Sequence, residues 1–301
     1  FMHDGGHDTL FESRWSNWAF GIICMMPLMA TFVAFKEDHL DHHRHNRSPK
    51  DPDAFTMGKR GLLDFLAFYA YVVLGVVLSF IHFNFIYPFT RFGAKEWAIH
   101  LAETVFKVAC YWALIAWAIQ HGVLAKTLEL WLVPVYIFTL FNSVRFIAEH
   151  YGTPWDQGQL AGTRTIVSNP FNRYFWNNIN WHIGHHVYPA VPWYNLEELH
   201  RLMEPAIAAR GAIVDPSYTG VFVQALAGGP ETEERLAASL AARRAAAERS
   251  ASLPAGGRNR LSPRAPRAGS AARPFARRRR RARSEPAGPR ARRRRDPALR
   301  P

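Results

Sequence analysis

Residues 180–189 read Asn-Trp-His-Ile-Gly-His-His-Val-Tyr-Pro, and this stretch contains the most specific histidine pattern of the chain. Its core, HIGHH at residues 182–186, repeats the spacing of HLDHH at residues 39–43. On a helix, positions i, i+3 and i+4 fall within an arc of about 100°, so each motif directs three imidazoles into one small volume. A third motif, HDGGH at residues 3–7, places two further histidines on one helix face.

The three motifs together predict a metal site built from imidazole alone. The chain has only two cysteines, so a cysteine-based zinc cluster is excluded. Eight histidines are too many for one tetrahedral zinc, and they suit two metals that share a pocket. Imidazole accepts zinc, iron, copper and nickel, so ligand chemistry leaves the metal open at this point. The eight candidates are His3, His7, His39, His42, His43, His182, His185 and His186.

Residues beside the three motifs extend the predicted site. His150 ends the last apolar run and is a ninth candidate ligand. Ligand histidines usually donate their other ring N–H to a carboxylate or a carbonyl. The candidates for orienting the ligands in this way are Asp4, Asp41, Glu149, Asn178 and Asn180. By contrast, His82, His100 and His121 have no histidine partner nearby, and we expect them to pack rather than to bind metal.

Four long apolar runs separate the motifs, at residues 18–35, 62–90, 97–120 and 128–144. A helix needs about 20 residues to span a bilayer, so several of these runs qualify or nearly qualify. So many long uncharged runs are hard to bury in a soluble chain of 301 residues. The sequence therefore predicts an all-α fold: a helical integral membrane protein with a histidine-rich cap formed outside the bilayer.

The net charge of +13 belongs to one end of the chain. Residues 231–301 hold 21 arginines, no lysine and only six acidic residues, whereas residues 1–230 are nearly neutral. This Ala/Arg/Pro-rich segment has a low-complexity composition that cannot bury a core, and we expect most of it to be disordered. Its one aromatic residue, Phe275, offers no base-stacking surface, so no nucleic-acid partner is expected. The predicted domains are therefore a membrane domain at residues 1–230 and a terminal segment at residues 231–301.

With these motifs in place, the chain resembles the membrane-bound fatty acid desaturase superfamily over roughly residues 3–205. The resemblance rests on HDGGH, on HLDHHRH followed by DPD at residues 51–53, on AEHYG at residues 148–152, and on residues 178–200. The last stretch, NINWHIGHHVYPAVPWYNLEELH, is the most specific. In it the histidine box, the proline-containing turn and the Tyr-Asn-Leu segment come in the family's order.

The resemblance implies a helical membrane enzyme whose all-histidine di-iron centre lies on the cytosolic face. It implies that the eight motif histidines and His150 hold two iron ions, with no catalytic group beyond the metal centre. The co-substrate would be O2, the substrate a lipid acyl chain in the bilayer, and the electron donor a separate cytochrome b5-like or ferredoxin-like protein. Family members carry membrane helices ahead of the first box, so we expect this chain to be truncated at its N-terminus.

The predicted function is O2-dependent desaturation of a fatty acyl chain in lipid metabolism, which makes the protein an oxidoreductase. Attack on a methylene by activated O2 needs a redox metal, which excludes zinc for this reaction. One alternative is hydroxylation or ketolation of a lipid, carotenoid or alkane by the same centre. Another is a membrane zinc protein without redox chemistry.

The shared pocket also constrains the path of the chain through a membrane. If all three motifs reach one pocket, an even number of crossings separates any two of them. Residues 18–35 should then lie in the interface or re-enter rather than span. We expect residues 97–120 to pair with residues 128–147 as a crossing hairpin, and residues 62–90 to be embedded without crossing.

Overall fold

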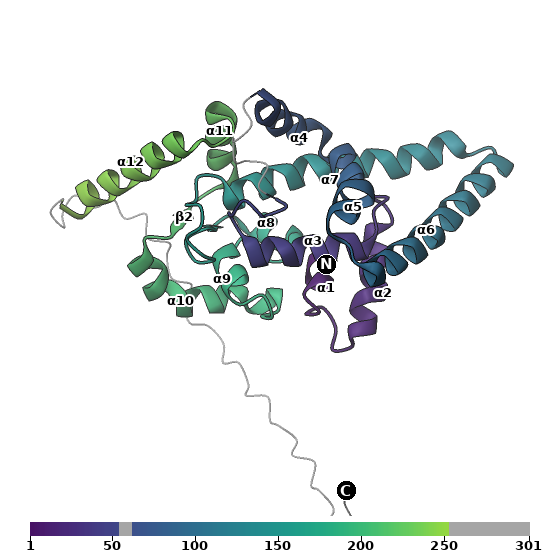
Figure 1. The fold of residues 1–301 in the computed structure, drawn as a ribbon, viewed down its shortest axis with the longest axis horizontal. Helices are drawn as coiled ribbons and strands as arrows, with labels where there is room; N and C mark the ends of the chain where they lie inside the picture. Colours follow the sequence, from purple (N-terminus) through teal and green to yellow (C-terminus); the bar gives the residue numbers. More distant parts are fainter. Residues whose placement is uncertain (54–61, 253–301) are drawn as a thin grey trace, which may run out of the picture. The chain divides into compact units, whose positions relative to one another are not determined.

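Helices make up most of the computed structural model, which describes residues 1–53 and 62–252 (Figure 1). Helix α4 (Leu62–Ile81) continues through a π-helical turn, η2 (His82–Ile86), into α5 (Tyr87–Arg91). Helices α6 (Ala94–Gln120) and α7 (Leu124–His150) follow. Within the described residues, three helical stretches are long and apolar enough to cross a membrane: residues 62–91, 94–120 and 124–150.

Helices α6 and α7 form a hairpin joined by a short turn at residues 121–123 (Figure 1). Gly122 occupies the left-handed region of this turn with φ +67°, a conformation that glycine adopts without steric cost. The predicted pairing of these two runs is confirmed, and both helices extend a few residues beyond the predicted limits. Large apolar side chains such as Trp112 and Phe141 are exposed along both helices.

The apolar run at residues 18–35 is divided between two helices and forms no single helix of membrane-spanning length. Helix α2 (Arg14–Met25) has 12 residues and ends just before Pro27. Helix α3 (Phe32–His45) starts after the extended residue Thr31. A helix of 12 residues is shorter than the roughly 20 that a bilayer requires.

Helix α3 carries the second histidine motif, and its N-terminal end is held from two sides. The side chain of Thr31 does not cap the helix. Instead Glu103 of α6 accepts hydrogen bonds from the backbone N–H groups of Phe32 and Val33, at 2.6 and 3.2 Å. On the other side, the ring of Phe32 lies so close to Gly21 of α2 that any side chain at residue 21 would collide with it. These contacts fix where α3 presents its histidines.

The region after α7 consists of turns, helices shorter than α6 and α7, and two short strands. It contains α8 (Pro170–Phe175), α9 (His182–Val187), a 3-10 helix η3 (Trp193–Asn195), α10 (Leu196–Arg210) and α11 (Tyr218–Gly228). A small parallel sheet of β1 (Arg164–Ile166) and β2 (Ile213–Asp215) departs from the all-α expectation. Each strand has three residues, too few for an alternating pattern to be visible in the sequence.

Helix α9 carries the third histidine motif and packs on α10. Its residue Ile183 is buried together with Met203 and Ile207 of α10. A Cβ atom at Gly184 would lie 3.3 Å from the side chain of Leu199, so glycine allows the two helices to approach closely. Helix α10 thus covers one side of α9 and leaves the histidines on the other.

The described part of the chain forms one unit, Phe1–Ser252. The expected domain boundary at residue 230 falls inside it, because the next stretch is tied to the rest. Glu231 and Leu236 are both buried, and Glu231 pairs with Arg47 at 3.0 Å. Helix α12 (Glu233–Ser252) completes the unit. The expectation of disorder after residue 252 lies outside the described residues.

Candidate metal centre

The structure brings all nine predicted ligands together in two adjoining clusters. Their imidazole nitrogens converge within each cluster, although the residues come from four separate helices and, for His7, from the residue that follows α1. The first cluster consists of His3, His7, His39, His43 and His185. The second consists of His42, His150 and His186, with His182 in contact with the last two.

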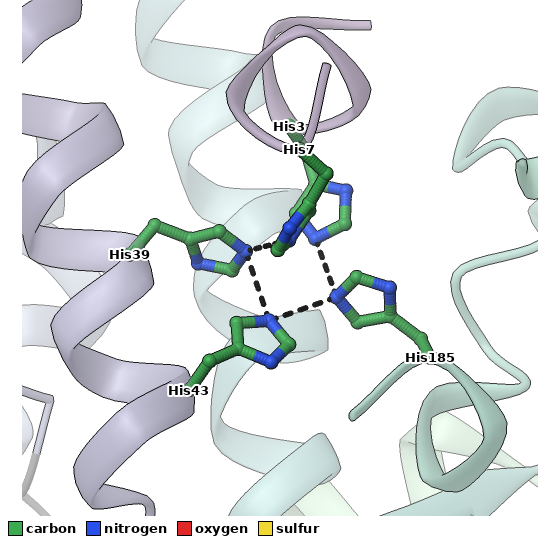
Figure 2. Close-up of side chains that lie close together, drawn as sticks. All are labelled: His3, His7, His39, His43 and His185. Atoms are coloured by element: carbon green, nitrogen blue, oxygen red, sulfur yellow. Dashed lines mark hydrogen bonds between the residues drawn. The ribbon is translucent and has the colours of Figure 1, made fainter. Parts of the chain in front are cut away.

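Five Nε2 atoms face one another in the first cluster (Figure 2). The Nε2 atom of His43 lies 3.2 Å from that of His39 and 3.0 Å from that of His185. The Nε2 atom of His3 lies 3.1 Å from that of His185, and His7 and His39 are separated by 2.8 Å. The ring nitrogens come from α1 (Met2–Gly6) and the residue that follows it, and from α3 and α9.

In the second cluster, His182 adjoins the group formed by His42, His150 and His186. Its Nε2 atom lies 2.9 Å from Nε2 of His150 and 3.0 Å from Nε2 of His186. The ring of His42 completes the group, with its centroid 4.7 Å from that of His150 and 5.0 Å from that of His186. All four side chains are buried. Helices α3, α7 and α9 therefore each contribute to this cluster.

Each HxxHH motif divides its three histidines between the two clusters. On α3, His39 and His43 join the first cluster and His42 joins the second. On α9, His185 joins the first cluster and His182 and His186 join the second. In both motifs the i, i+4 pair stays together, because these residues lie one above the other on a helix face. The intervening histidine lies to one side of that pair and reaches the neighbouring cluster.

Hydrogen bonds to Nδ1 orient several of these rings so that Nε2 points inward. Nδ1 of His42 lies 2.9 Å from Oδ1 of Asp51, and Nδ1 of His186 lies 2.9 Å from Oε1 of Gln159. Such a partner keeps the ring proton on Nδ1 and leaves the Nε2 lone pair for a metal. Nδ1 of His150 faces the backbone carbonyl of Gly162 more loosely, at 3.4 Å.

The residues predicted to orient the ligand histidines differ in their positions relative to the clusters. Asp4 lies beside the first cluster, with Oδ1 3.5 Å from Nδ1 of His3. Asp41 instead accepts a hydrogen bond from Tyr87 at 2.8 Å and pairs with Arg44. Thus Asp4 has the predicted position, whereas the hydrogen bonds of Asp41 go to residues outside the clusters.

The asparagines before the third motif shape the backbone. Asn180 donates a hydrogen bond to the backbone oxygen of Ile166 in β1 at 2.9 Å, which ties the start of α9 to the sheet. Asn178 adopts φ +54° in the preceding turn. Both residues therefore help to position α9. Within the part of the chain that the structure describes, neither side chain hydrogen-bonds to a clustered histidine. Glu149 faces His182, with 3.7 Å between Oε2 and Nε2.

Several residues that contact the clusters or their partners were not predicted, among them Asp51, Gln159 and Tyr218. Asp51 lies in the DPD segment at residues 51–53, and its position in this motif could have indicated a role beside the metal centre. Gln159 lies in an irregular loop, and no motif or spacing in the sequence marks it. Tyr218 lies 69 residues beyond Glu149 and donates a hydrogen bond to it at 3.1 Å.

Burial keeps most of the cluster histidines neutral, which is the protonation state that binds metal. Removal from water lowers the pKa of His7, His39, His185, His182 and His186 well below the usual value, and lowers the pKa of His3 and His43 as well. His42 is the exception. Burial acts to lower its pKa too, but the negative charge of Asp51 and its hydrogen bond raise the pKa of His42 to about 9.

The histidines expected to pack lie outside both clusters, as predicted. His82 hydrogen-bonds to Asp38 at 2.7 Å, and His100 hydrogen-bonds to Thr31 at 2.8 Å. His121 contacts the backbone oxygen of Trp117 in its own helix turn.

A cavity of about 310 Å3 lies against the two clusters. Most of its lining surface is apolar, and histidines of both clusters line it as well. Its apolar lining includes Phe35, Val76, Leu78, Phe83, Phe138 and Phe146. Its histidines are His3, His39, His42, His82, His150 and His182.

These features define a helical histidine-box protein: two adjoining all-histidine clusters, an apolar cavity beside them, and three helices of membrane-spanning length. Residues 1–218 match the family model described as fatty acid desaturase. The chain therefore belongs to the fatty acid desaturase family, a family of membrane-bound oxidoreductases. The matched residues include all nine clustered histidines.

Proposed function

We propose that this protein desaturates a fatty acyl chain with O2 at a di-iron centre held by its nine clustered histidines. The observation that carries the proposal is the pair of adjoining histidine clusters beside an apolar cavity, in a chain of the desaturase family. The proposal also includes membrane insertion, with the histidine clusters on the cytosolic face.

The donor set fits two iron ions. Two ligands that each lie about 2.1 Å from one metal are separated by roughly 3.0 Å at a right angle and roughly 4.2 Å when opposite. The close Nε2 separations of 2.8–3.2 Å in both clusters suit ligands at adjacent positions. Neutral imidazoles suit iron as well as zinc, and nine of them exceed what tetrahedral zinc uses.

Iron bound in these clusters would activate O2 for attack on an unactivated C–H bond. Reduction of O2 to two waters takes four electrons and four protons. Two electrons and two protons come from the neighbouring methylenes that become a double bond. The other two electrons come from a separate donor of the cytochrome b5 or ferredoxin type, and two protons come from solvent.

The residues of this chain would hold the metals and the substrate. Asp51 and Gln159 keep the lone pairs of His42 and His186 aimed inward through their Nδ1 contacts. The phenylalanines of the cavity wall give a methylene chain an apolar surface beside the clusters. The same lining excludes water from the place where the oxidant forms, which protects it from side reactions.

The membrane arrangement proposed for this function follows the sequence expectation. The α6–α7 hairpin would cross the bilayer twice and return the chain to the side where the other histidines lie. The apolar side chains exposed on both helices would then face lipid. The lipid substrate would enter the cavity from this phase, and no nucleic acid would take part.

The test is expression in a host membrane, followed by metal analysis and lipid profiling of the same preparation. About two irons per chain, together with a new double bond that requires O2 and reductant, would support the proposal. A hydroxyl or keto product would assign the centre to the related oxygenation reaction. Stoichiometric zinc and turnover without O2 would contradict the proposal.

A further inference from the structure

A buried carboxylate faces the second histidine cluster. Glu149 lies on the last turn of α7, next to His150, and its side chain is 1% exposed. Its Oε2 atom lies 3.7 Å from Nε2 of His182. Glu149 also lines the apolar cavity together with His150 and His182.

The ring nitrogen of His182 that Glu149 faces indicates the role of the carboxylate. Nε2 of His182 is the atom directed at His150 and His186, whereas Nδ1 of His182 makes no hydrogen bond within the described part of the chain. A carboxylate that orients a ligand histidine contacts the nitrogen remote from the metal. Asp51 does this at Nδ1 of His42. Glu149 therefore lies on the metal side of His182, not on the orienting side.

The distance suits two ligands of one metal. For donors about 2.1 Å from a common ion, a separation of 3.7 Å lies between that of adjacent ligands, roughly 3.0 Å, and that of opposite ligands, roughly 4.2 Å. The shorter contacts of His182 with His150 and His186, at 2.9 and 3.0 Å, suit adjacent positions around the same ion.

Two hydrogen bonds hold this carboxylate in place. Tyr218 donates to Oε1 of Glu149 at 3.1 Å, and Nη1 of Arg145 donates to Oε2 at 2.9 Å. Each carboxylate oxygen has two lone-pair sites, so Oε2 can accept from Arg145 and still bind a metal. Because the side chain is already fixed, metal binding costs little additional conformational entropy.

We propose that Glu149 is the tenth ligand of the metal centre and binds the ion of the second cluster. The inference rests on the proposed di-iron site. It gives each cluster five side-chain donors: five imidazoles in the first, and four imidazoles with one carboxylate in the second. The carboxylate brings a negative charge and a hard oxygen donor to one metal only. The two irons would then differ in their ligand sets.

The experiment uses the full chain labelled with 13C-glutamate, and Fe2+ added without oxygen. Infrared difference spectra between metal-free and loaded protein should show a shifted carboxylate stretch that is sensitive to the label. In Glu149→Gln this band should be absent, and the affinity for the second Fe2+ should fall at least tenfold. Tyr218→Phe removes one hydrogen bond but keeps the carboxylate, so this matched control should retain the band.

Each other outcome has a defined meaning. If the wild-type chain binds two Fe2+ without a label-sensitive carboxylate band, Glu149 is not a ligand and the di-iron proposal stands. The same holds if Glu149→Gln shows an unchanged band. Should Glu149→Gln fail to fold, the Tyr218→Phe spectrum decides the matter, because loss of the hydrogen bond to Oε1 shifts the frequency of the band only if the band belongs to Glu149. An unshifted band in Tyr218→Phe would then contradict the inference. If the wild-type chain binds no iron, both the proposed function and this inference fail.

Discussion

The rings of His43 and His186 stack with their centroids 4.1 Å apart and only 21° between their planes. His43 belongs to the first histidine cluster and His186 to the second, so this contact joins the two. A displacement of either ring changes the space available to the other. The two clusters therefore form one structural unit, although each gathers its own set of nitrogen atoms.

Removal of one ligand from each cluster should separate their contributions. His185→Ala deletes a nitrogen of the first cluster, and His42→Ala deletes one of the second. Each variant should retain about one iron per chain in place of about two, and each should lose activity, because a missing donor leaves the ion under-coordinated. Metal analysis and product formation measure both effects. His121→Ala, an exposed histidine at the α6–α7 turn, is the control and should behave as wild type.

The affinity of the second cluster should increase with pH. The pKa of His42 is about 9 in the metal-free protein, since the charge of Asp51 outweighs the effect of burial. Below that pH a metal must displace a proton from His42, so affinity should rise up to about tenfold per pH unit and level off above pH 9. Anaerobic Co2+ titrations between pH 6.5 and 9.5 measure this. Asp51→Asn should shift the rise to lower pH, and an affinity independent of pH from 7 to 9 would contradict the assignment.

Glu103 should stabilise the helix that carries the second motif. Glu103→Gln weakens the charge-assisted bonds to the N–H groups of Phe32 and Val33. Loss of a helix cap costs about 1–2 kcal/mol, so the melting temperature should fall and metal should dissociate faster. Glu129→Gln breaks only an exposed ion pair with Lys126 and serves as the control. Equal stability of the two variants would show that Glu103 does not anchor α3.

Gly184 should be required for close packing between α9 and α10. Gly184→Val places methyl groups against Leu199, which already lies within van der Waals reach of a Cβ atom. Overpacking of this kind costs about 1–3 kcal/mol and should move the third motif, so metal retention should decrease. The double variant Gly184→Val with Leu199→Ala recreates the space. Failure of the second substitution to restore metal binding would mean that the defect does not arise from this contact.

Two deletions should place the boundary of the folded unit. Removal of residues 253–301 leaves the Glu231–Arg47 pair and α12 intact, so metal content and stability should match the full chain. Removal of residues 231–301 also takes away Glu231 and leaves the buried Arg47 without this ion-pair partner. That change should destabilise the protein strongly. Thermal melting of the two shortened chains measures the difference, and similar melting temperatures would place the boundary at residue 230 after all.

Much of the site could be predicted from the sequence because its ligands obey local rules. The i, i+3, i+4 spacing of the second and third motifs requires only helical geometry, and His150 follows from the end of an apolar run. The division of each motif between two clusters could not be predicted. It depends on how α3 and α9 are each placed by the rest of the fold, and tertiary contacts such as that of Gly184 with Leu199 of α10 place α9.

The limits of the sequence-based fold have a similar origin. The α6–α7 hairpin was predictable because long apolar runs with a short link leave few arrangements. The capping of α3 by Glu103 joins residues 71 positions apart, and no pattern connects them. Likewise, the burial of Glu231 beside Arg47 depends on a pairing across 184 positions. Because of this pairing, the folded unit extends beyond residue 230, where the composition changes.

The contact between His3 and His185 spans 182 positions of the chain. A ribosome makes the first of these residues long before the second, so the first cluster stays incomplete throughout most of synthesis. Loop closure over such a distance is also entropically costly, and contacts of this kind form late in folding. Metal insertion at the proposed centre would therefore follow completion of α9. A chain that stalls earlier lacks His182, His185 and His186 of α9, so both clusters are incomplete on an unfinished protein.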